Sequence, residues 1–255
     1  MIQKDQISKF VEVVKLNLPF EANSGQKQAI AMIGEFVLGE LDRSVFVLKG
    51  YAGTGKTNLM SAITLALPTF KWRSVLLAPT GRAAKVLSAN AKRPAFTIHK
   101  KIFKKVQNGD GSISFFPADN LHKNTLFIVD EASMINANSD DAGLFGSLLE
   151  NLFEYVYSGV NCKLILIGDT AQLPPVGSVL SPALSLDYLK NAFYLNISFY
   201  ELTEITKKKL ESGILLNATH LRNQLLVQDF EFPKLICGTD VINVTGDELE
   251  DALNS

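Results

Sequence analysis

One segment of the chain has the residue types and the spacing of a phosphate-binding loop. The pattern G-x-x-x-x-G-K-[ST] is met at every fixed position by Gly50, Tyr51, Ala52, Gly53, Thr54, Gly55, Lys56 and Thr57. The glycines let backbone N–H groups surround an anion without a clash from a Cβ atom, and a helix that begins here adds positive potential. Lys56 can reach the β- and γ-phosphates of ATP, and the Thr57 hydroxyl can bind Mg²⁺. The segment, which we call the phosphate loop, therefore predicts a site for ATP and Mg²⁺.

Two adjacent carboxylates supply what hydrolysis needs beyond the phosphate loop. Asp130 and Glu131 directly follow the apolar run 127–129. Asp130, at the tip of a strand, suits Mg²⁺, and Glu131 suits the attacking water as its general base. An Asp-Glu pair after a strand is also a common helix cap, but its combination with the phosphate loop favours the catalytic interpretation.

A third polar turn, residues 168–175, follows another apolar run. Ligands of open α/β sheets bind at the carboxyl ends of the strands, so this turn is expected to face the same crevice. Gln172 within it can hydrogen-bond the γ-phosphate or the attacking water. The simpler alternative is a proline-stiffened connection.

These segments need a sheet whose strands end side by side, and the rest of the sequence predicts one. Short apolar runs alternate with helical patterns, which is typical of an α/β fold with a parallel sheet covered on both faces. Strands are expected at 44–49, 74–78, 125–130, 163–168 and 198–205. Helices are expected at 56–67, 81–88 and 145–156, and another begins at a capping box formed by Asn23 and Gln26.

The pattern changes between residues 94 and 123. Residues 108–111 read Asn-Gly-Asp-Gly, which is a strong turn signal, and residues 112–116 alternate polar and apolar types. A small β-hairpin inserted between two strands of the sheet is therefore expected here.

Charge is distributed unevenly although its net value is −1. Residues 82–105 contain eight basic residues, beginning with Arg82, and no acidic one, whereas residues 228–255 contain seven acidic residues against one Lys. Such segregation can give a neutral molecule a basic face for nucleic acid. The alternative is a solvated surface stretch.

Composition excludes several other classes of protein. With 47% apolar and 20% charged residues, the 255-residue chain is neither disordered nor collagen-like. Cys162 and Cys237 lie far apart without Cys/His pairing, which argues against a zinc site and favours a cytoplasmic location. No apolar run approaches the ~18 residues of a membrane span, so no membrane partner is expected.

The motifs GYAGTGKT, APTGRAAK, TIHK, VDEAS and GDTAQLPPVG, in this order, resemble the RecD-like branch of superfamily-one DNA helicases. The resemblance covers about residues 20–225. It implies a RecA-like P-loop NTPase fold, with a central, mostly parallel sheet flanked by helices and the small inserted β-hairpin. It also implies an ATP-driven motor that moves 5′ to 3′ on single-stranded DNA.

The resemblance assigns roles to individual residues. It implies that Gln26 reads the adenine base, that Lys56 and Thr57 hold phosphate and Mg²⁺, and that Gln172 senses the γ-phosphate. Asp130 and Glu131 would be the metal ligand and the general base. The inserted hairpin lies where the family carries a strand-separating pin. Positions matching DNA contacts, with Arg82 added from the basic stretch, are Pro79, Thr80, Arg82, Thr97 and His99.

Two features depart from the family pattern. The family usually shows Leu-Thr-Glu-x-x-Arg, with the arginine reaching the γ-phosphate, whereas here Lys207 takes that position. Lysine keeps the charge but lacks the planar fork of arginine, so slower hydrolysis is expected. The family motor also has two RecA-like domains, and the second supplies an arginine finger that is worth ~10³–10⁵ in rate in P-loop enzymes.

The expected organisation follows from that comparison. Residues 1–228 would form a RecA-like P-loop ATPase domain, with the pin-like hairpin at about 94–123, and residues 229–255 an acidic segment leading toward an absent second RecA-like domain. The implied partners are single-stranded DNA and that second domain or subunit. A nuclease or repair complex stays open as a further partner. The chain alone is expected to bind nucleotide and turn it over poorly, without unwinding a duplex.

Two alternatives belong to other functional classes. The domain can be a regulatory or nucleic-acid-binding module that uses ATP only as a switch. A small-molecule kinase would share the phosphate loop, but the carboxylate pair and the Gln172 turn argue against it.

Overall fold

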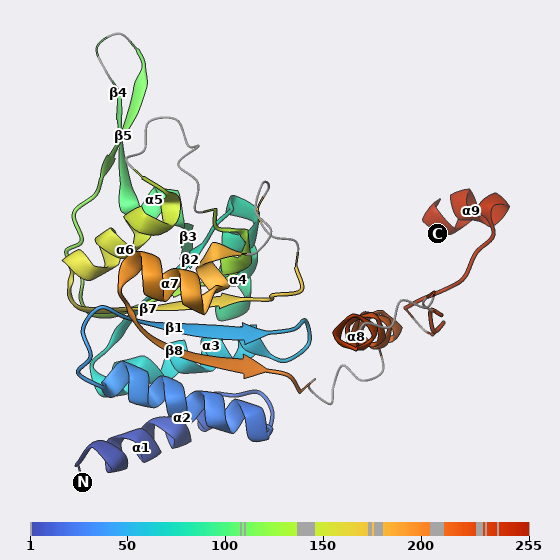
Figure 1. Cartoon of the computed structure of the whole chain (residues 1–255), viewed down its shortest axis with the longest axis horizontal. Helices are drawn as coiled ribbons and strands as arrows, with labels where there is room; N and C mark the ends of the chain where they lie inside the picture. The colour runs from blue at the N-terminus through green and yellow to red at the C-terminus, as the bar shows by residue number, and fades with distance from the viewer. Residues whose placement is uncertain are drawn as a thin grey trace. The chain divides into compact units, whose positions relative to one another are not determined.

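The structure, a computed structural model, describes residues 2–107, 109, 111–136, 146–172, 175, 181–204, 212–227, 232, 234–238 and 240–254. The chain forms two compact units, Met1–Glu204 and Ile205–Ser255. The first unit contains the phosphate loop and the main sheet (Figure 1).

The main sheet has six strands in the order β3-β2-β6-β7-β1-β8, and every neighbouring pair in it is parallel. The five expected strands are all present, and the short strand β3 is added at one edge. The bounds are β1 Ser44–Gly50, β2 Arg73–Ala78, β3 Ala95–Thr97, β6 Lys123–Val129, β7 Val160–Gly168 and β8 Asn196–Leu202.

The central strands are continuous apolar runs because both faces of the sheet are covered. In β1, Phe46 and Leu48 point into one core cluster, whereas Val45 and Val47 point into another. The first cluster receives apolar side chains from α1, α2, α3 and α4, and the second receives them from α5, α6 and α7. Figure 1 shows the two layers, with α1 and α2 on one side of the sheet and α6 and α7 on the other.

The expected helices are present with small shifts at their ends. The capping box of Asn23 and Gln26 begins α2, and a second box begins α6. Helices α1, α5 and α7 had no counterpart among the expected elements; α1 packs against α2 and α3. The bounds are α1 Ile2–Leu16, α2 Ser24–Leu38, α3 Lys56–Ala66, α4 Gly81–Ala91, α5 Ile98–Ile102, α6 Leu148–Ser158 and α7 Leu186–Phe193, with the 3₁₀ turns η1 Leu67–Phe70, η2 Ala132–Met134 and η3 Pro182–Leu184.

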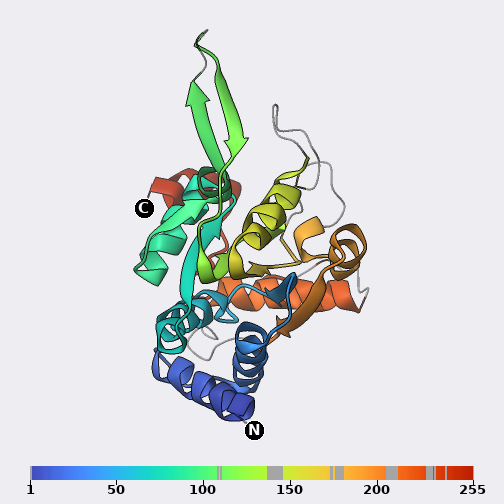
Figure 2. The same ribbon diagram turned by 90° about the vertical axis from the view of Figure 1, so that its left-hand side faces the viewer.

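The inserted hairpin is formed by β4 (Phe103–Gln107) and β5 (Ile113–Pro117), which pair antiparallel. It projects away from the main sheet as a two-stranded ribbon (Figure 2). Phe115 and Phe116 in β5 are half exposed, so the ribbon carries apolar side chains without a core of its own.

Lys163 lies within β7 but is only 3% exposed, because it caps a neighbouring helix. Its Nζ donates to the carbonyl oxygens of Phe36 at 2.6 Å and of Gly39 at 2.5 Å, at the C-terminal end of α2. The ammonium also lies over the rings of Phe36 and Trp72, 5.4 and 5.7 Å from their centroids. Carbonyl groups at a helix C-terminus have no partner within the helix, and Lys163 supplies one from the sheet.

Replacing Lys163 with methionine is therefore expected to lower the free energy of unfolding by about 1–3 kcal/mol, since buried carbonyl oxygens would lose their donor. Denaturant unfolding measures this loss. Lys123→Met, at an exposed position of β6, is the matched control and should change stability little. Equal stability of the two variants would contradict the capping role of Lys163.

The same capping contact makes stability depend on pH. Burial lowers the pKa of Lys163 to about 8, from 10.5 for a free lysine side chain. The unfolded chain therefore binds more protons than the folded chain between these two values, and the contribution of Lys163 to stability rises with pH across that window. The stability difference between wild type and Lys163→Met should grow from about pH 8 to pH 10. A difference that shrinks over this range would contradict the assignment.

The second unit is held together by side chains that bond to backbone groups. The carboxylate of Asp240 accepts hydrogen bonds from the Ser212 hydroxyl at 2.6 Å and from the Gly213 N–H at 2.7 Å, where α8 (Gly213–Leu226) begins. Asn217 donates to the Ile236 carbonyl at 2.9 Å and accepts from the Ile236 N–H at 2.7 Å. These contacts attach the segment around residue 236 to α8.

A capping box of Thr245 and Glu248 precedes the last helix, α9 (Leu249–Asn254). The unit boundary falls at 204/205, and the proposed functional division at residue 228 stays a prediction.

Candidate nucleotide-binding site

The phosphate loop connects β1 to α3 in the conformation that its glycines allow. Gly53 and Gly55 both have φ of +88°, a left-handed backbone that side chains with a Cβ rarely adopt. Gly50 needs its small size for a different reason: a Cβ there would lie 2.9 Å from Thr54 Oγ1 and 3.0 Å from Leu202 Cβ. The loop is thus packed tightly between its own turn and the end of β8.

Lys56 is the first residue of α3, and its side chain folds back over the loop. Its Nζ donates to the carbonyl oxygens of Gly50 at 2.5 Å and of Tyr51 at 3.0 Å. The Thr54 hydroxyl donates to the Tyr51 carbonyl at 2.8 Å. The ammonium group therefore lies directly beside the backbone that would surround a phosphate.

Gln26 is buried against the loop, where it makes one contact that the sequence did not predict in addition to its expected place in the capping box of α2. Its Nε2 donates to the Thr54 carbonyl at 2.9 Å, and its Oε1 accepts the N–H of Asn23 at 3.2 Å. The side chain thus ties the N-terminus of α2 to the phosphate loop. Reading of the adenine by Gln26 stays a prediction. The side-chain amide has a second N–H and a second lone pair that these two bonds do not use.

Asp130 and Glu131 follow the carboxyl end of β6. Asp130 Oδ1 accepts the N–H of Glu131 at 3.0 Å, and Glu131 has a left-handed backbone with φ of 55°. Burial and the neighbouring charge of Glu131 raise the pKa of Asp130, while the positive charge of Lys56 acts in the opposite direction. Lys56 and Asp130 therefore lie close enough to interact electrostatically, although they are far apart in sequence.

Gln172 follows the end of β7 in a tight turn. Asp169, which is 5% exposed, accepts the N–H of Ala171 at its Oδ1 at 2.9 Å and the N–H of Gln172 at its carbonyl oxygen at 3.3 Å. The Gln172 Oε1 in turn accepts the hydroxyl of Ser133 at 2.9 Å. The turn is thereby linked to the segment that directly follows the two carboxylates, and Ser133 is a residue to which sequence reasoning gave no role.

The strand order explains how these groups meet. All six strands are parallel, so the turns after β6, β7 and β1 emerge at the same edge, with the Gln172 turn between the carboxylates and the phosphate loop. Neighbouring strands are ~4.8 Å apart, so the ends of β1 and β6 are separated by roughly 10 Å. A triphosphate spans a distance of this order.

The donor set at this edge fits Mg²⁺. The Thr57 hydroxyl and the Asp130 carboxylate are oxygen ligands, which a hard cation prefers. The raised pKa of Asp130 has its cause in burial and in the charge of Glu131, and a bound cation would relieve both. Thr57 and Asp130 are accordingly the residues that would hold the ion.

The candidate DNA contacts lie at the other end of the same edge, after β2 and β3. The Thr80 hydroxyl accepts the N–H of Ala83 at 3.2 Å and caps α4, and the Thr97 hydroxyl accepts the N–H of Lys100 at 3.2 Å and caps α5. Both threonines thus have a structural role beside any contact with DNA.

The other candidate DNA contacts differ in how exposed their side chains are. Arg82 is exposed at the start of α4, whereas Pro79 and His99 are partly buried. The ring of His99 lies 6.0 Å from the ring of Phe103. Contact of these residues with DNA stays a prediction.

The basic stretch, residues 82–105, contains paired and buried side chains as well as exposed ones. Lys104 forms an ion pair with Asp119 at 2.7 Å, so its charge is already compensated. Phe103 is 8% exposed and belongs to the core. Phe96 is exposed at 37%, and the two phenylalanines of β5 are exposed as well, so these three rings are available on the surface.

Glu204 lies just after the end of β8, the strand that is next to β1 in the sheet. Its Oε1 accepts the hydroxyl of Ser24 at 2.6 Å, which joins the end of β8 to the first residue of α2. Lys207, expected near the γ-phosphate, lies outside the described residues.

Among the helices that the structure describes, none has the length and apolar character to cross a membrane.

Comparison with known proteins gives a consistent result. A family model described as an AAA domain matches residues 21–222. The ATP-dependent DNA helicase dda of Enterobacteria phage T4 is 30% identical over 232 residues, which cover 89% of this chain and 47% of that protein. The ATP-dependent RecD2 DNA helicase of Deinococcus radiodurans is 31% identical over 176 residues, covering 66% of this chain and 21% of that protein.

The chain spans about half the length of the phage helicase and a smaller share of the Deinococcus helicase. Among solved structures, the Pif1 helicase from Bacteroides in complex with ADP-AlF3 and ssDNA aligns with a TM-score of 0.46 and 16% identity, covering 91% of this chain and 56% of that one.

Proposed function

The chain belongs to the AAA domain family, and from that premise we propose that it binds and hydrolyses ATP as the motor domain of a RecD-like DNA helicase acting on single-stranded DNA. The observation that carries the proposal is the convergence of the phosphate loop, Asp130 and Gln172 at one sheet edge, where Lys56 interacts electrostatically with Asp130. Two relatives named as ATP-dependent DNA helicases support the choice of motor class.

In this proposal each residue acts on a different part of the nucleotide. Lys56 and the backbone N–H groups of the phosphate loop bind the phosphates, and Thr57 and Asp130 hold Mg²⁺, which neutralises phosphate charge when bound. Glu131 orients the attacking water and accepts its proton. Gln172 reports on the γ-phosphate through its amide. Gln172 accepts a hydrogen bond from Ser133, and through this bond a change at the γ-phosphate would affect the segment after β6.

Single-stranded DNA would bind along the other end of the edge. Helix α4 begins there with the exposed Arg82 in its first turn, and residues 82–105 contain no acidic residue. Phosphate contacts of this kind give binding that tolerates any sequence and weakens with salt. The inserted hairpin would act as a strand-separating pin.

Unwinding is proposed to need more than these residues. The phage relative is about twice as long as the matched part, and its activity belongs to the whole protein. A second RecA-like domain or subunit would complete the ATP site with an arginine finger, which is worth ~10³–10⁵ in rate in P-loop enzymes. Slow hydrolysis and no duplex unwinding are therefore expected from this chain alone.

The proposal is tested by single-turnover ATP hydrolysis, measured with excess protein in the presence and absence of single-stranded DNA. A motor domain should hydrolyse faster with DNA, and the acceleration should fade as salt weakens DNA binding. If hydrolysis is present but does not respond to DNA that is shown to bind, ATP acts as a switch and the motor assignment is wrong. Duplex DNA of the same length serves as the matched control.

A further inference from the structure

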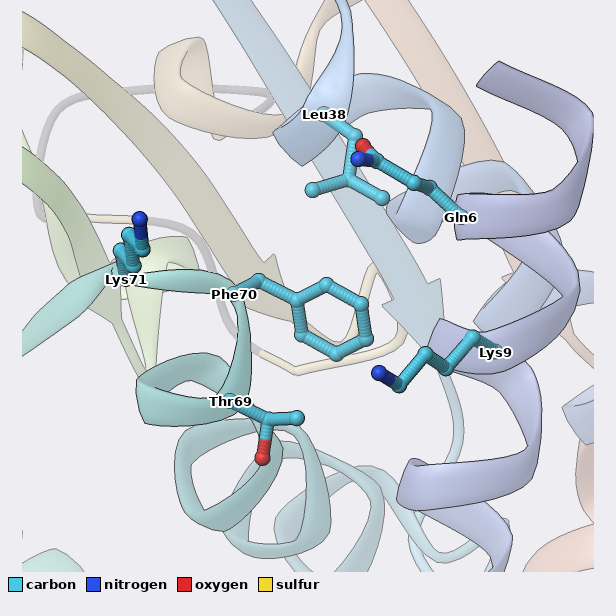
Figure 3. Close-up of a pocket in the computed structure, with 6 residues that line it drawn as sticks. All are labelled: Gln6, Lys9, Leu38, Thr69, Phe70 and Lys71. Carbon is cyan, nitrogen blue, oxygen red and sulfur yellow. The ribbon is translucent and has the colours of Figure 1, made fainter. Parts of the chain in front are cut away.

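A groove lies between helix α1 and the 3₁₀ turn η1, far from the phosphate loop. It encloses about 270 Å³ and is lined by Gln6, Lys9, Leu38, Thr69, Phe70 and Lys71. Figure 3 shows the Phe70 ring in the middle of the groove, with Lys9 reaching toward it from α1 and Lys71 on the opposite side. Gln6 and Leu38 close the upper end in this view. The groove is thus an apolar floor between two ammonium groups.

The groove is separate from the nucleotide site. Helix α3 begins in the phosphate loop and ends at Ala66, just before η1, and α2 begins beside Thr54 and ends at Leu38. Both helices therefore run from the nucleotide site to the groove, and the 11 residues of α3 cover roughly 16 Å. One wall is α1, which lies outside the residues 21–222 that match the family.

The chemistry of the lining selects an anionic ligand that has an apolar part. Neither Lys9 nor Lys71 has an ion-pair partner within the part of the chain that the structure describes, and no lining residue is acidic. Phe70 and Leu38 are partly buried and offer an apolar surface between the two charges. Phe70 is itself held in place by Phe10, whose ring centroid is 5.3 Å away.

The size of the groove limits what can enter it. At about 270 Å³ the groove lies just below the ~300–1,000 Å³ that is typical of pockets for cofactors and drug-sized molecules, and it has room for a large side chain. An extended segment that lies across it can place an apolar side chain on Phe70 and a carboxylate near each lysine. A nucleic-acid strand would instead need a continuous row of cations, which the sequence places at residues 82–105.

We propose that this groove is a docking site for an acidic peptide segment of a partner protein, which inserts one aromatic or aliphatic side chain against Phe70 and pairs its carboxylates with Lys9 and Lys71. The site would recruit the ATPase to that partner without entering the nucleotide-binding edge. Its function does not depend on the proposed hydrolysis.

The test is fluorescence anisotropy of the full chain with a labelled peptide that has aspartates around one phenylalanine. Lys9→Gln combined with Lys71→Gln should weaken binding about fivefold or more, because both ion pairs are lost. Gln6→Trp, at an exposed position, should fill the groove and abolish binding. The matched control is Lys4→Gln combined with Lys15→Gln, which removes two exposed charges of α1 outside the groove.

Each outcome decides the proposal. Binding that needs both the aspartates and the phenylalanine of the peptide, and that the groove variants weaken while the control variant keeps it, supports the docking site. Equal binding by the groove and control variants overturns it. If a labelled single-stranded oligonucleotide loses affinity with the groove variants and the peptide does not bind, the surface contacts nucleic acid and the proposal is wrong. Nucleotide binding should be unchanged in every variant, so failure here leaves the ATPase assignment intact.

Discussion

Replacing Glu131 with glutamine is expected to lower the single-turnover rate of ATP hydrolysis by about 10²–10⁴-fold, because the proposed general base is lost. Binding of Mg·ATP should stay intact, since Glu131 is not among the residues that would hold the phosphates or the ion. The substitution is expected to leave the fold unchanged. Glutamine has the same length, and the N–H of residue 131 that donates to Asp130 is a backbone group.

Rapid-quench hydrolysis and a separate measurement of nucleotide affinity distinguish the two effects. Glu154→Gln, at an exposed position on α6, is the matched control and should hydrolyse ATP like the wild type. Retention of the wild-type rate by the Glu131→Gln variant would remove Glu131 from the mechanism. A parallel loss of binding and hydrolysis would instead indicate that Glu131 helps to hold the nucleotide.

The Lys56→Ala variant should lose both hydrolysis and nucleotide affinity. The ammonium lies on the carbonyl groups of Gly50 and Tyr51, beside the backbone that would surround the phosphates, and it interacts electrostatically with Asp130. Removing one preorganised donor from a site of this kind typically costs about 10²–10³-fold in rate. Binding should weaken as well, because the proposed role of the lysine is to contact the phosphates both before and during the reaction.

Lys15→Ala, an exposed position near the end of α1, is the control for loss of a positive charge. Thermal unfolding should show that the Lys56→Ala variant still folds, since α3 begins with its backbone unchanged. Hydrolysis at the wild-type rate by Lys56→Ala would mean that the loop does not act on the phosphates.

Much of the first unit could be predicted because its signals are local. The central strands contain apolar runs such as 45–48, and the phosphate loop is defined by glycine spacing over a few residues. Together they place the main groups at one sheet edge, since parallel strands share their carboxyl ends. The resemblance to RecD-like superfamily-one helicases is confirmed by the relatives that the chain matches.

The rest depends on contacts between residues that are distant in sequence. Nothing in the local pattern of Ser24 or Glu204 indicates that their side chains meet across 180 positions. The family resemblance implies an adenine contact for Gln26, and its bond to the Thr54 carbonyl could not be predicted because that bond exists only in the folded chain. Strand β3 has only three residues, which is too short for an apolar run to stand out.

The helix-capping roles of two threonine hydroxyl groups could not be predicted from the sequence either. Thr80 and Thr97 were expected to contact DNA, and both also cap helices. Neither is followed three residues later by Glu or Gln, so the capping-box pattern that marks a helix start in sequence is missing. A cap of this simpler kind becomes visible only when the backbone is placed.

The central claim is that a nucleoside triphosphate binds across the ends of β1, β7 and β6. Calorimetric titration of the wild-type chain with Mg²⁺ and a non-hydrolysable ATP analogue tests it most directly, with Lys56→Ala titrated in parallel. The account predicts saturable binding by the wild type that needs Mg²⁺ and is strongly weakened in the variant. Absence of heat with the wild type, or equal binding by the variant, would contradict it.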